Sequence, residues 1–131
     1  MRIWVPRETK PGENRVSLTP AGASALRAAG AAVVVESGAG AASGFADREY
    51  LEAGARVVPH GGDAWSADLV AKVKEPLPPE YGFLSPSSAL FTFLHLAAFP
   101  ELTRELRTRR VTAVAYETVA SGDVLPILRP M

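Results

Sequence analysis

Strand-like and helix-like segments alternate along the whole chain, and this alternation constrains the fold more than any other feature. The predicted strands are residues 2–6, 31–37, 55–58, 68–74, 89–96 and 111–119, and the predicted helices are residues 19–30, 47–54 and 100–110. The run 31–37 is continuously apolar and rich in β-branched residues, as is typical of a strand buried on both faces. The pattern predicts a doubly wound, mainly parallel α/β sheet flanked by helices, Rossmann-like or flavodoxin-like, in a single domain over residues 1–131.

Capping residues predict where the first two helices begin and end. Thr19 followed by Pro20 is a typical helix start, and Gly30 is a typical stop. Asp47 is the predicted cap of the next helix, and Gly54 is its predicted terminator.

Composition excludes several classes of site. The fourteen basic and fourteen acidic residues cancel, so no net field favours nucleic acid or an anionic membrane. The chain has no cysteine, which excludes disulfides, thiolate catalysis and cysteine-based metal sites, and two histidines argue against a zinc site. Because no apolar run could span a bilayer and the N-terminus lacks a signal-peptide core, we expect a cytoplasmic protein. From the cysteine and histidine counts we expect no metal site.

Chemically useful side chains follow the predicted strands. In doubly wound sheets, ligands bind beyond the carboxyl ends of the strands. Arg15 follows the first strand, Lys74 ends the fourth, His95 ends the fifth, and Tyr116 and Glu117 end the sixth. The sequence therefore predicts that these residues meet at one edge of the sheet.

Each of these residues also has an ordinary structural interpretation. Lys74 shares a strand face with Lys72 by the two-residue period and could be a solvated edge lysine. His95 lies in an apolar run, where a hydrogen-bonded core histidine is common. Arg15 could simply pair with Glu13, and His60 is interpreted as a loop residue without a role.

A glycine-rich stretch, "VVVESGAGAASGF" (33–45), raises the question of dinucleotide binding. The G-x-G-x-x-G fingerprint requires a third glycine inside a helix that begins at the turn. Here Ser43 holds that position, Gly44 comes one residue late, and the helix signal begins only at Asp47. The acid expected about twenty residues on is represented only by Asp63, which does not end a strand. We therefore expect this loop not to bind a dinucleotide.

Five segments together resemble a known family. They are "ENRVSLTPAG", "ESGAGAASGFADREYLEAGA", "KVKEPLPPEY", "FTFLHLAAFPELT" and "VTAVAYETV". In order, and across essentially the whole chain, they resemble the N-terminal part of alanine dehydrogenase. The related alpha subunit of nicotinamide nucleotide transhydrogenase shares the general layout, but the lysine–histidine pair looks like the dehydrogenase.

The resemblance implies roles for particular residues. Arg15 matches the arginine that binds the substrate carboxylate, to which a planar guanidinium is suited. Lys74 matches the lysine that contacts the substrate carbonyl or carboxylate. His95 matches the catalytic histidine, an acid/base toward the substrate oxygen. Glu75, Tyr116 and Glu117 are weaker candidates for supporting or carboxylate-positioning roles.

The implied reaction is the reversible, NAD-dependent oxidative deamination of L-alanine to pyruvate and ammonia. The resemblance also implies that the NAD-binding half and the helices that cover one face of the sheet lie outside residues 1–131. We therefore expect this chain alone to bind no NAD, to be inactive, to expose an apolar face and to form homo-oligomers. Two alternatives stay open: a standalone module that binds pyruvate-like small acids or serves as an interaction module, without redox chemistry, and the substrate-side domain of a transhydrogenase-like subunit.

Overall fold

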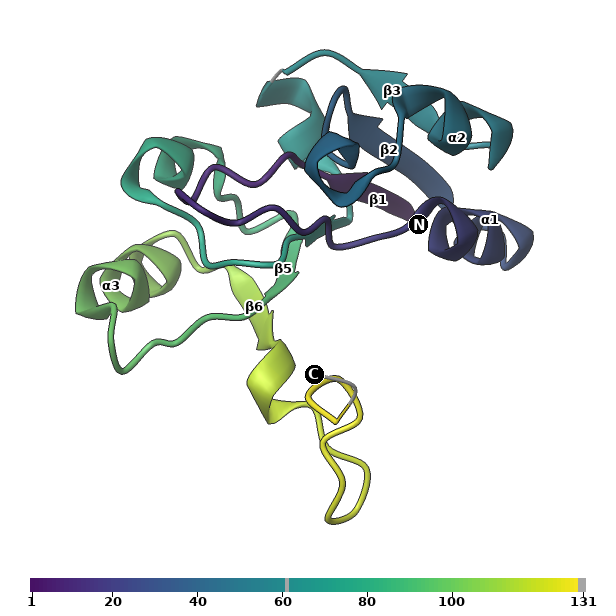
Figure 1. Cartoon of the computed structure of the whole chain (residues 1–131). Coiled ribbons are helices and arrows are strands. Elements are labelled where there is room, and N and C mark those ends of the chain that lie inside the picture. The colour runs from purple at the N-terminus through teal and green to yellow at the C-terminus, as the bar shows by residue number, and fades with distance from the viewer. Residues whose placement is uncertain (61, 130–131) are drawn as a thin grey trace.

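A parallel β-sheet forms the centre of the computed structural model, which describes residues 1–60 and 62–129. Within these residues the sheet has six strands in the order β3-β2-β1-β4-β5-β6, and all neighbours are parallel. The strands are β1 (Arg2–Val5), β2 (Ala32–Glu36), β3 (Arg56–Val58), β4 (Leu69–Ala71), β5 (Ala89–Thr92) and β6 (Thr112–Ala115). The predicted doubly wound parallel fold is confirmed (Figure 1).

The order of the strands reverses between β1 and β4. The chain proceeds from β1 outward to β2 and β3, then returns to β4 on the other side of β1 and continues outward to β6. The loops that leave β1 and β4 therefore diverge, and this opens a crevice at the carboxyl edge where such sheets bind ligands.

Helices cover both faces of the sheet, but they cover a different half of the sheet on each face. On one face, α1 (Pro20–Ala28) packs on β2, and α2 (Asp47–Glu52) packs on β3, around a core that includes Val5, Val35 and Tyr50. The opposite face packs against α3 (Pro100–Thr108) and the 3-10 turns η2 (Gly62–Ser66) and η3 (Pro78–Phe83). Figure 1 shows α1 and α2 together at one end of the molecule and α3 at the other. No helix in the described ranges is both long and apolar enough to cross a membrane.

The first two helices begin in different ways. Thr19 caps α1 as predicted, because its side-chain oxygen accepts from the N–H of Gly22 at 3.1 Å. Asp47 does not cap α2, so that prediction is wrong. Ala46 precedes the helix, and its N–H donates to the Glu49 carboxylate at 2.7 Å. This leaves the Asp47 carboxylate to accept from Gly38 N–H at 2.8 Å.

Strands β4, β5 and β6 end earlier than predicted. They stop at Ala71, Thr92 and Ala115, and the 3-10 turn η4 (Tyr116–Thr118) follows β6. The reason is that carboxylates take backbone N–H groups just beyond β4 and β5. Glu8 accepts from residues 73 and 74, and Glu117 accepts from residues 94 and 95. Lys74 and His95 therefore lie in loops after the strands, and the prediction that Lys72 and Lys74 share a strand face is wrong.

The sheet face that α1 and α2 cover over β2 and β3 continues over β4 to β6, and there no helix of the described chain packs on it. Leu69 and Phe91 are half-buried there, and Val114 is 41% exposed. A hollow of about 200 Å³ lies beside them. An apolar face is thus open to contact, and self-association through it remains a prediction that light scattering can test.

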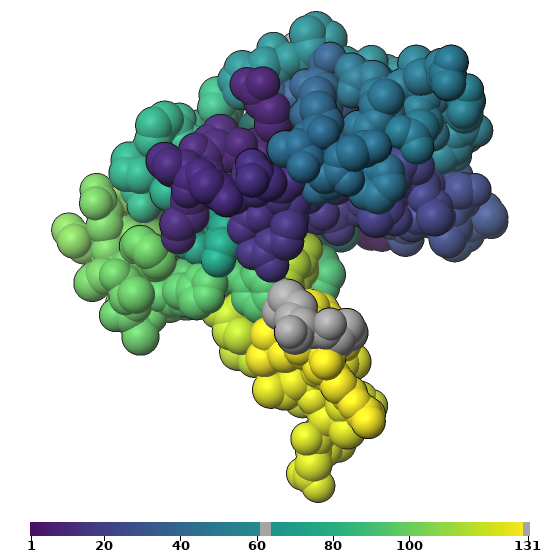
Figure 2. Space-filling model, viewed as in Figure 1, coloured from purple at the N-terminus to yellow at the C-terminus, as the bar shows by residue number. Residues whose placement is uncertain are grey.

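The residues after η4 extend away from the rest of the molecule. An isolated antiparallel bridge joins Ser121 and Val124, and Asp123 marks the tip of this segment. Figure 2 shows the segment as an arm that projects from the body. Its residues Val124 and Leu125 are exposed apolar side chains.

Candidate functional site

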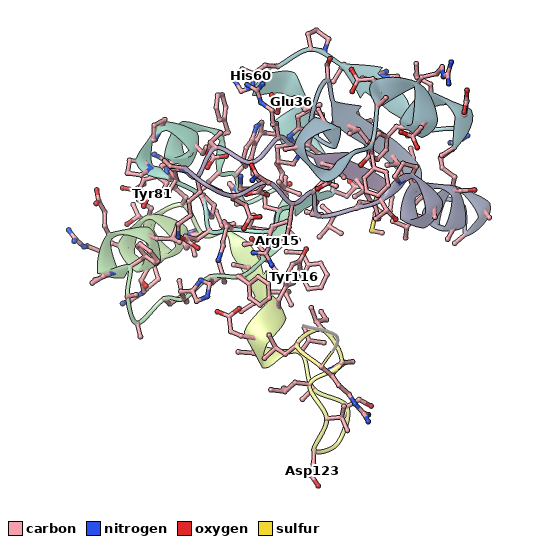
Figure 3. All side chains as sticks on the ribbon, viewed as in Figure 1. Arg15, Glu36, His60, Tyr81, Tyr116 and Asp123 are labelled. Carbon is pink, nitrogen blue, oxygen red and sulfur yellow. The ribbon has the colours of Figure 1, made fainter. Side chains whose placement is uncertain are left out.

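A hollow of about 280 Å³ opens at the carboxyl edge of the sheet. It draws its walls from the segment after β1, the glycine-rich loop, the ends of β4 to β6 and the C-terminal arm. The lining residues are Arg15, Val16, Ser17, Thr19, Ser43, Phe45, Val73, Phe93, Tyr116 and Ile127. Figure 3 shows Arg15 and Tyr116 next to each other at this place. Since the walls are largely apolar and Arg15 is the charged residue among them, the hollow suits a small anion with an apolar part.

Arg15 combines the two interpretations of the sequence. Its guanidinium donates to Glu13 from Nε at 2.8 Å and from Nη2 at 2.6 Å, so the ordinary ion pair exists. Yet the Arg15 side chain is 51% exposed and lines the hollow. The hydrogen bond from Arg15 lowers the pKa of Glu13 to about 2. An incoming anion would therefore share this guanidinium with a carboxylate that stays ionised.

Replacing Glu13 with glutamine should weaken the dependence of stability on acid pH. The lowered pKa of Glu13 contributes stability above its ordinary value of 4.5, and this contribution is lost as the pH falls towards 2. In Glu13→Gln, the free energy of unfolding should fall less steeply with acid, by at most about 1.4 kcal/mol per pH unit. Urea unfolding at a series of pH values measures this. Glu52→Gln, which removes an exposed carboxylate paired with Arg48, is the control variant.

Lys74 lies beside the hollow and is not among its lining residues. Its backbone N–H donates to Glu8 at 3.2 Å, and its side chain is half-buried. The Lys74 charge is near enough to Glu13 to help lower the pKa of Glu13. Lys74, Glu13 and Arg15 thus form one charged group at the end of β4.

His95 is held in an unusual backbone conformation at the end of β5. Its φ is 47°, in the left-handed region that non-glycine residues rarely adopt. The Glu117 carboxylate accepts from the backbone N–H of His95 at 2.8 Å and from that of Leu94 at 3.1 Å. The His95 side chain is 43% exposed, so the core-histidine interpretation is wrong. Its ring stacks on Phe93, which lines the hollow, with 5.8 Å between ring centroids.

The three weaker candidates, Glu75, Tyr116 and Glu117, each contact His95 or its neighbour Phe93. Glu75 is 1% exposed and contacts Lys10 and the His95 ring. Tyr116 lines the hollow and packs edge-on against Phe93, and burial raises the pKa of its hydroxyl. Burial also favours a raised pKa for Glu117, but the backbone N–H groups that it accepts from outweigh burial and lower it.

Two further charged residues, Glu8 and Lys10, lie near the site and were not predicted from the sequence. Glu8 accepts from the N–H groups of Val73 and Lys74, and its side chain is 3% exposed. Lys10 Nζ donates to Glu75 and lies over the Phe99 ring. Both belong to the charged loop after β1, and that concentration of charge was the available signal.

The glycine-rich loop is not shaped to hold phosphate. Gly38 N–H donates to the Asp47 carboxylate, and the N–H groups of Ala39, Ala41, Ser43, Gly44 and Phe45 donate to carbonyls within the loop or at its start. These N–H groups are therefore already hydrogen-bonded within the protein. The Asp47 carboxylate also places a negative charge where a phosphate would need a positive field. The position of Gly40 has no room for a side chain, because Tyr50 packs against it. An added Cβ would lie 2.8 Å from the Tyr50 ring. The loop's described residues do not fit a dinucleotide.

Replacing Gly40 with alanine should therefore destabilise the fold. The new Cβ would meet Tyr50 at 2.8 Å and Phe45 Cβ at 2.9 Å, and Tyr50 is fully buried. We expect a loss of about 1–3 kcal/mol in the free energy of unfolding, as for other overpacked sites. Chemical denaturation measures it. Gly82→Ala, where nothing lies within 4 Å of the added Cβ, is the matched control, and equal stability of the two variants would contradict this account.

Among the described residues, no group of three or more His, Cys, Asp or Glu side chains is arranged to hold a metal ion. His60 pairs with Glu36, with 2.9 Å between Nδ1 and Oε1. Figure 3 shows this pair near the top of the view, away from Arg15.

Comparison with known proteins gives consistent matches. Residues 4–131 match the family described as "Alanine dehydrogenase/PNT, N-terminal domain". The chain is 52% identical to the alanine dehydrogenase of Bacillus subtilis (strain 168), over all of this chain and 35% of that protein. It is 47% identical to the alanine dehydrogenase of Bilophila wadsworthia, again over all of this chain and 35% of the relative.

Solved structures agree with the sequence matches. An L-alanine dehydrogenase superposes with a TM-score of 0.94 at 50% identity, covering 99% of this chain and 36% of that one. A transhydrogenase from Sinorhizobium meliloti superposes with a TM-score of 0.83 at 30% identity, covering 89% of this chain and 35% of that one. This chain thus spans about a third of the length of the relatives it matches.

Proposed function

This chain belongs to the alanine dehydrogenase/PNT N-terminal domain family, and on that premise we propose that it is the substrate-binding domain of an alanine dehydrogenase. The reaction served would be the reversible oxidation of L-alanine to pyruvate and ammonia, with hydride passing between the alanine Cα and NAD. The observation that carries the proposal is a small, largely apolar hollow at the carboxyl edge of the sheet. Arg15 lines this hollow, Lys74 follows its lining residue Val73, and the His95 ring stacks on its lining residue Phe93.

Arg15 would bind the substrate carboxylate. Its planar fork can donate to two oxygens, and it lines the hollow from the segment after β1. The apolar walls, which include Val73 and Phe93, would surround the methyl group of alanine or pyruvate. The arrangement thus offers one group for the charge of the substrate and a wall for its apolar end.

Lys74 and His95 would act at the other end of the substrate. Lys74 would place a positive charge near the carbonyl oxygen and polarise the C=O bond. His95 would move a proton to or from the substrate oxygen as water adds and ammonia leaves, work for which an imidazole is suited near neutral pH. The partly exposed ring of His95 supports such access.

The nicotinamide would come from outside the described residues of this chain. NAD supplies the hydride acceptor when bound. The glycine-rich loop does not fit it, because loop amides already donate to backbone carbonyls and the Gly38 N–H donates to the Asp47 carboxylate. The share of this chain in this work is therefore to bind, orient and exchange a proton with the amino or oxo acid. We further propose that residues 1–131 form one domain, that the protein is a cytoplasmic homo-oligomer, and that this chain alone does not turn over.

Two other functions keep part of this proposal. A standalone module that binds small acids would use the same hollow without redox chemistry. A transhydrogenase-like subunit is supported by the superposition at 30% identity, but the match to an L-alanine dehydrogenase is higher, at 50% identity. NADH oxidation by this chain with pyruvate and ammonia would contradict the proposal that it is inactive alone.

Replacing Lys74 with methionine should remove the preference of the protein for a 2-oxo acid. Propionate matches pyruvate except for the carbonyl oxygen, so the difference between their affinities reports contact with that oxygen. Wild type should bind pyruvate about tenfold or more tightly than propionate, as expected for a hydrogen bond to a charged group. In Lys74→Met the two affinities should converge. Calorimetry with both acids measures this, and the absence of pyruvate binding to wild type would overturn the proposed function.

A further inference from the structure

A buried carboxylate contacts the ring of His95. Glu75 Oε2 lies 3.2 Å from His95 Nδ1, and the Glu75 side chain is 1% exposed. An ionised carboxylate can only accept hydrogen bonds. A hydrogen bond at this place therefore requires the proton of a neutral imidazole to be on Nδ1.

Glu75 is able to stay ionised in its buried place because Lys10 compensates its charge. Lys10 Nζ donates to Glu75 Oε1, and the Lys10 side chain is itself 33% exposed. Burial alone would raise the pKa of Glu75, but the hydrogen bonds from Lys10, its own backbone N–H and His95 outweigh burial and lower it. The ammonium also lies 5.3 Å from the centroid of the Phe99 ring, which helps to hold it over the carboxylate.

The backbone, one ring face and Nδ1 of His95 are all held by neighbouring residues. For its Nε2, no hydrogen-bond partner is found among the described residues. Glu117 fixes the backbone N–H groups of Leu94 and His95, and Phe93 supports one face of the ring. Nδ1 is taken by Glu75. A hydrogen bond at one ring nitrogen decides which nitrogen carries the proton, and this logic applies to any histidine held by a carboxylate.

We propose that Glu75, neutralised by Lys10, is a positioning residue that holds neutral His95 in the Nδ1–H form and leaves Nε2 to exchange the proton with the substrate oxygen. The assignment of the exchanging nitrogen rests on the proposed function, whereas the tautomer itself does not. Lys10 and Glu75 are not among the residues that line the hollow, and they act through His95.

Long-range ¹H–¹⁵N spectra of the imidazole rings test this directly, because the two nitrogens of a neutral ring resonate far apart when only one carries a proton. The chain has two histidines, so the spectrum holds two ring systems. His60 is a matched reference, since its Nδ1 lies 2.9 Å from Glu36. In the neutral ring of wild-type His95 we expect a protonated Nδ1 and a bare Nε2, with about a tenfold or greater excess over the other form.

Glu75→Gln should reduce that excess by about tenfold or more, because the amide can donate to a bare Nδ1 as readily as accept from a protonated one. Glu36→Gln should change the His60 signals and leave those of His95 in place. A wild-type His95 with its proton on Nε2 would overturn the inference even if Glu75→Gln failed to fold. An unchanged His95 in a folded Glu75→Gln variant would also overturn it.

The part played by Lys10 has its own readout, which is the ¹³C carboxyl titration of Glu75. Lys10→Met should raise the pKa of Glu75, because a cation and a hydrogen bond are lost, and Lys10→Arg should keep it low. An equal pKa in wild type and Lys10→Met would remove Lys10 from the proposal. These measurements use the ligand-free protein, so they succeed or fail independently of pyruvate binding, whose absence would overturn only the proposed function.

Discussion

Replacing Arg15 with alanine should weaken pyruvate binding by about tenfold to a hundredfold. The guanidinium lines the hollow, and a hydrogen-bonded contact to a charged group contributes about 1.5–3 kcal/mol. The variant also leaves Glu13 ionised without its partner, so that a negative charge faces the incoming carboxylate. Calorimetric titration with pyruvate measures the loss.

Two further variants make this result specific. Arg15→Lys keeps the charge but not the planar fork, so its affinity should fall between those of wild type and Arg15→Ala. Arg56→Ala removes the same charge from a different hollow, about 240 Å³ in volume, and should bind pyruvate as wild type does. Equal affinities of Arg15→Ala and wild type would exclude Arg15 as the carboxylate ligand.

Replacing Lys72 with alanine should cost about 3–5 kcal/mol in the free energy of unfolding, the usual effect of removing one partner from a buried ion pair. The Lys72 side chain is 1% exposed, and its Nζ lies 2.8 Å from Glu80 and 3.5 Å from Glu8. Both carboxylates would be left buried without their cation. Burial already raises the pKa of Glu8 in the presence of Lys72.

Replacing Lys72 should also disturb the position of Lys74 at the candidate site. Glu8 joins the loop after β1 to the backbone of Val73 and Lys74, so a protonated or displaced Glu8 would loosen the attachment of Lys74. Guanidinium unfolding measures the stability, and the Lys74 amide shift reports the local change. Arg48→Ala breaks an exposed pair on α2 and should cost about 0.5 kcal/mol or less. A loss below about 1 kcal/mol for Lys72→Ala would show that the buried cluster does not stabilise the fold.

The arrangement of the sheet could be predicted because its signals are local. Continuous β-branched runs indicate parallel strands, and Thr19 followed by Pro20 indicates the start of α1. The ends of β4 and β5 could not be predicted in the same way. They depend on Glu8 and Glu117 taking backbone N–H groups from segments far along the chain, and no local pattern records such a contact.

The same distinction applies to the site. The rule that ligands bind at the carboxyl ends of strands predicted that Arg15, Lys74 and His95 meet at one edge. In the structure Arg15 lines the hollow, Lys74 follows its lining residue Val73, and His95 stacks on its lining residue Phe93. The contacts of Lys10 with Glu75 and of Glu8 with Val73 join residues 65 positions apart in each case. These contacts form only when distant parts of the chain meet in the folded protein, so no local sequence pattern predicts them. The left-handed backbone of His95 occurs where its N–H donates to Glu117, and no glycine in the sequence marks the position.

Mapping the backbone amide shifts of the ¹⁵N-labelled protein during a pyruvate titration tests the central claim most directly. If the chain binds a 2-oxo acid at the carboxyl edge of the sheet, the largest changes will lie at Arg15, Lys74, His95 and Tyr116. Changes gathered instead around Arg2, Arg56 and His60, which line the hollow of about 240 Å³, would contradict the claim. So would a titration that leaves every amide in place.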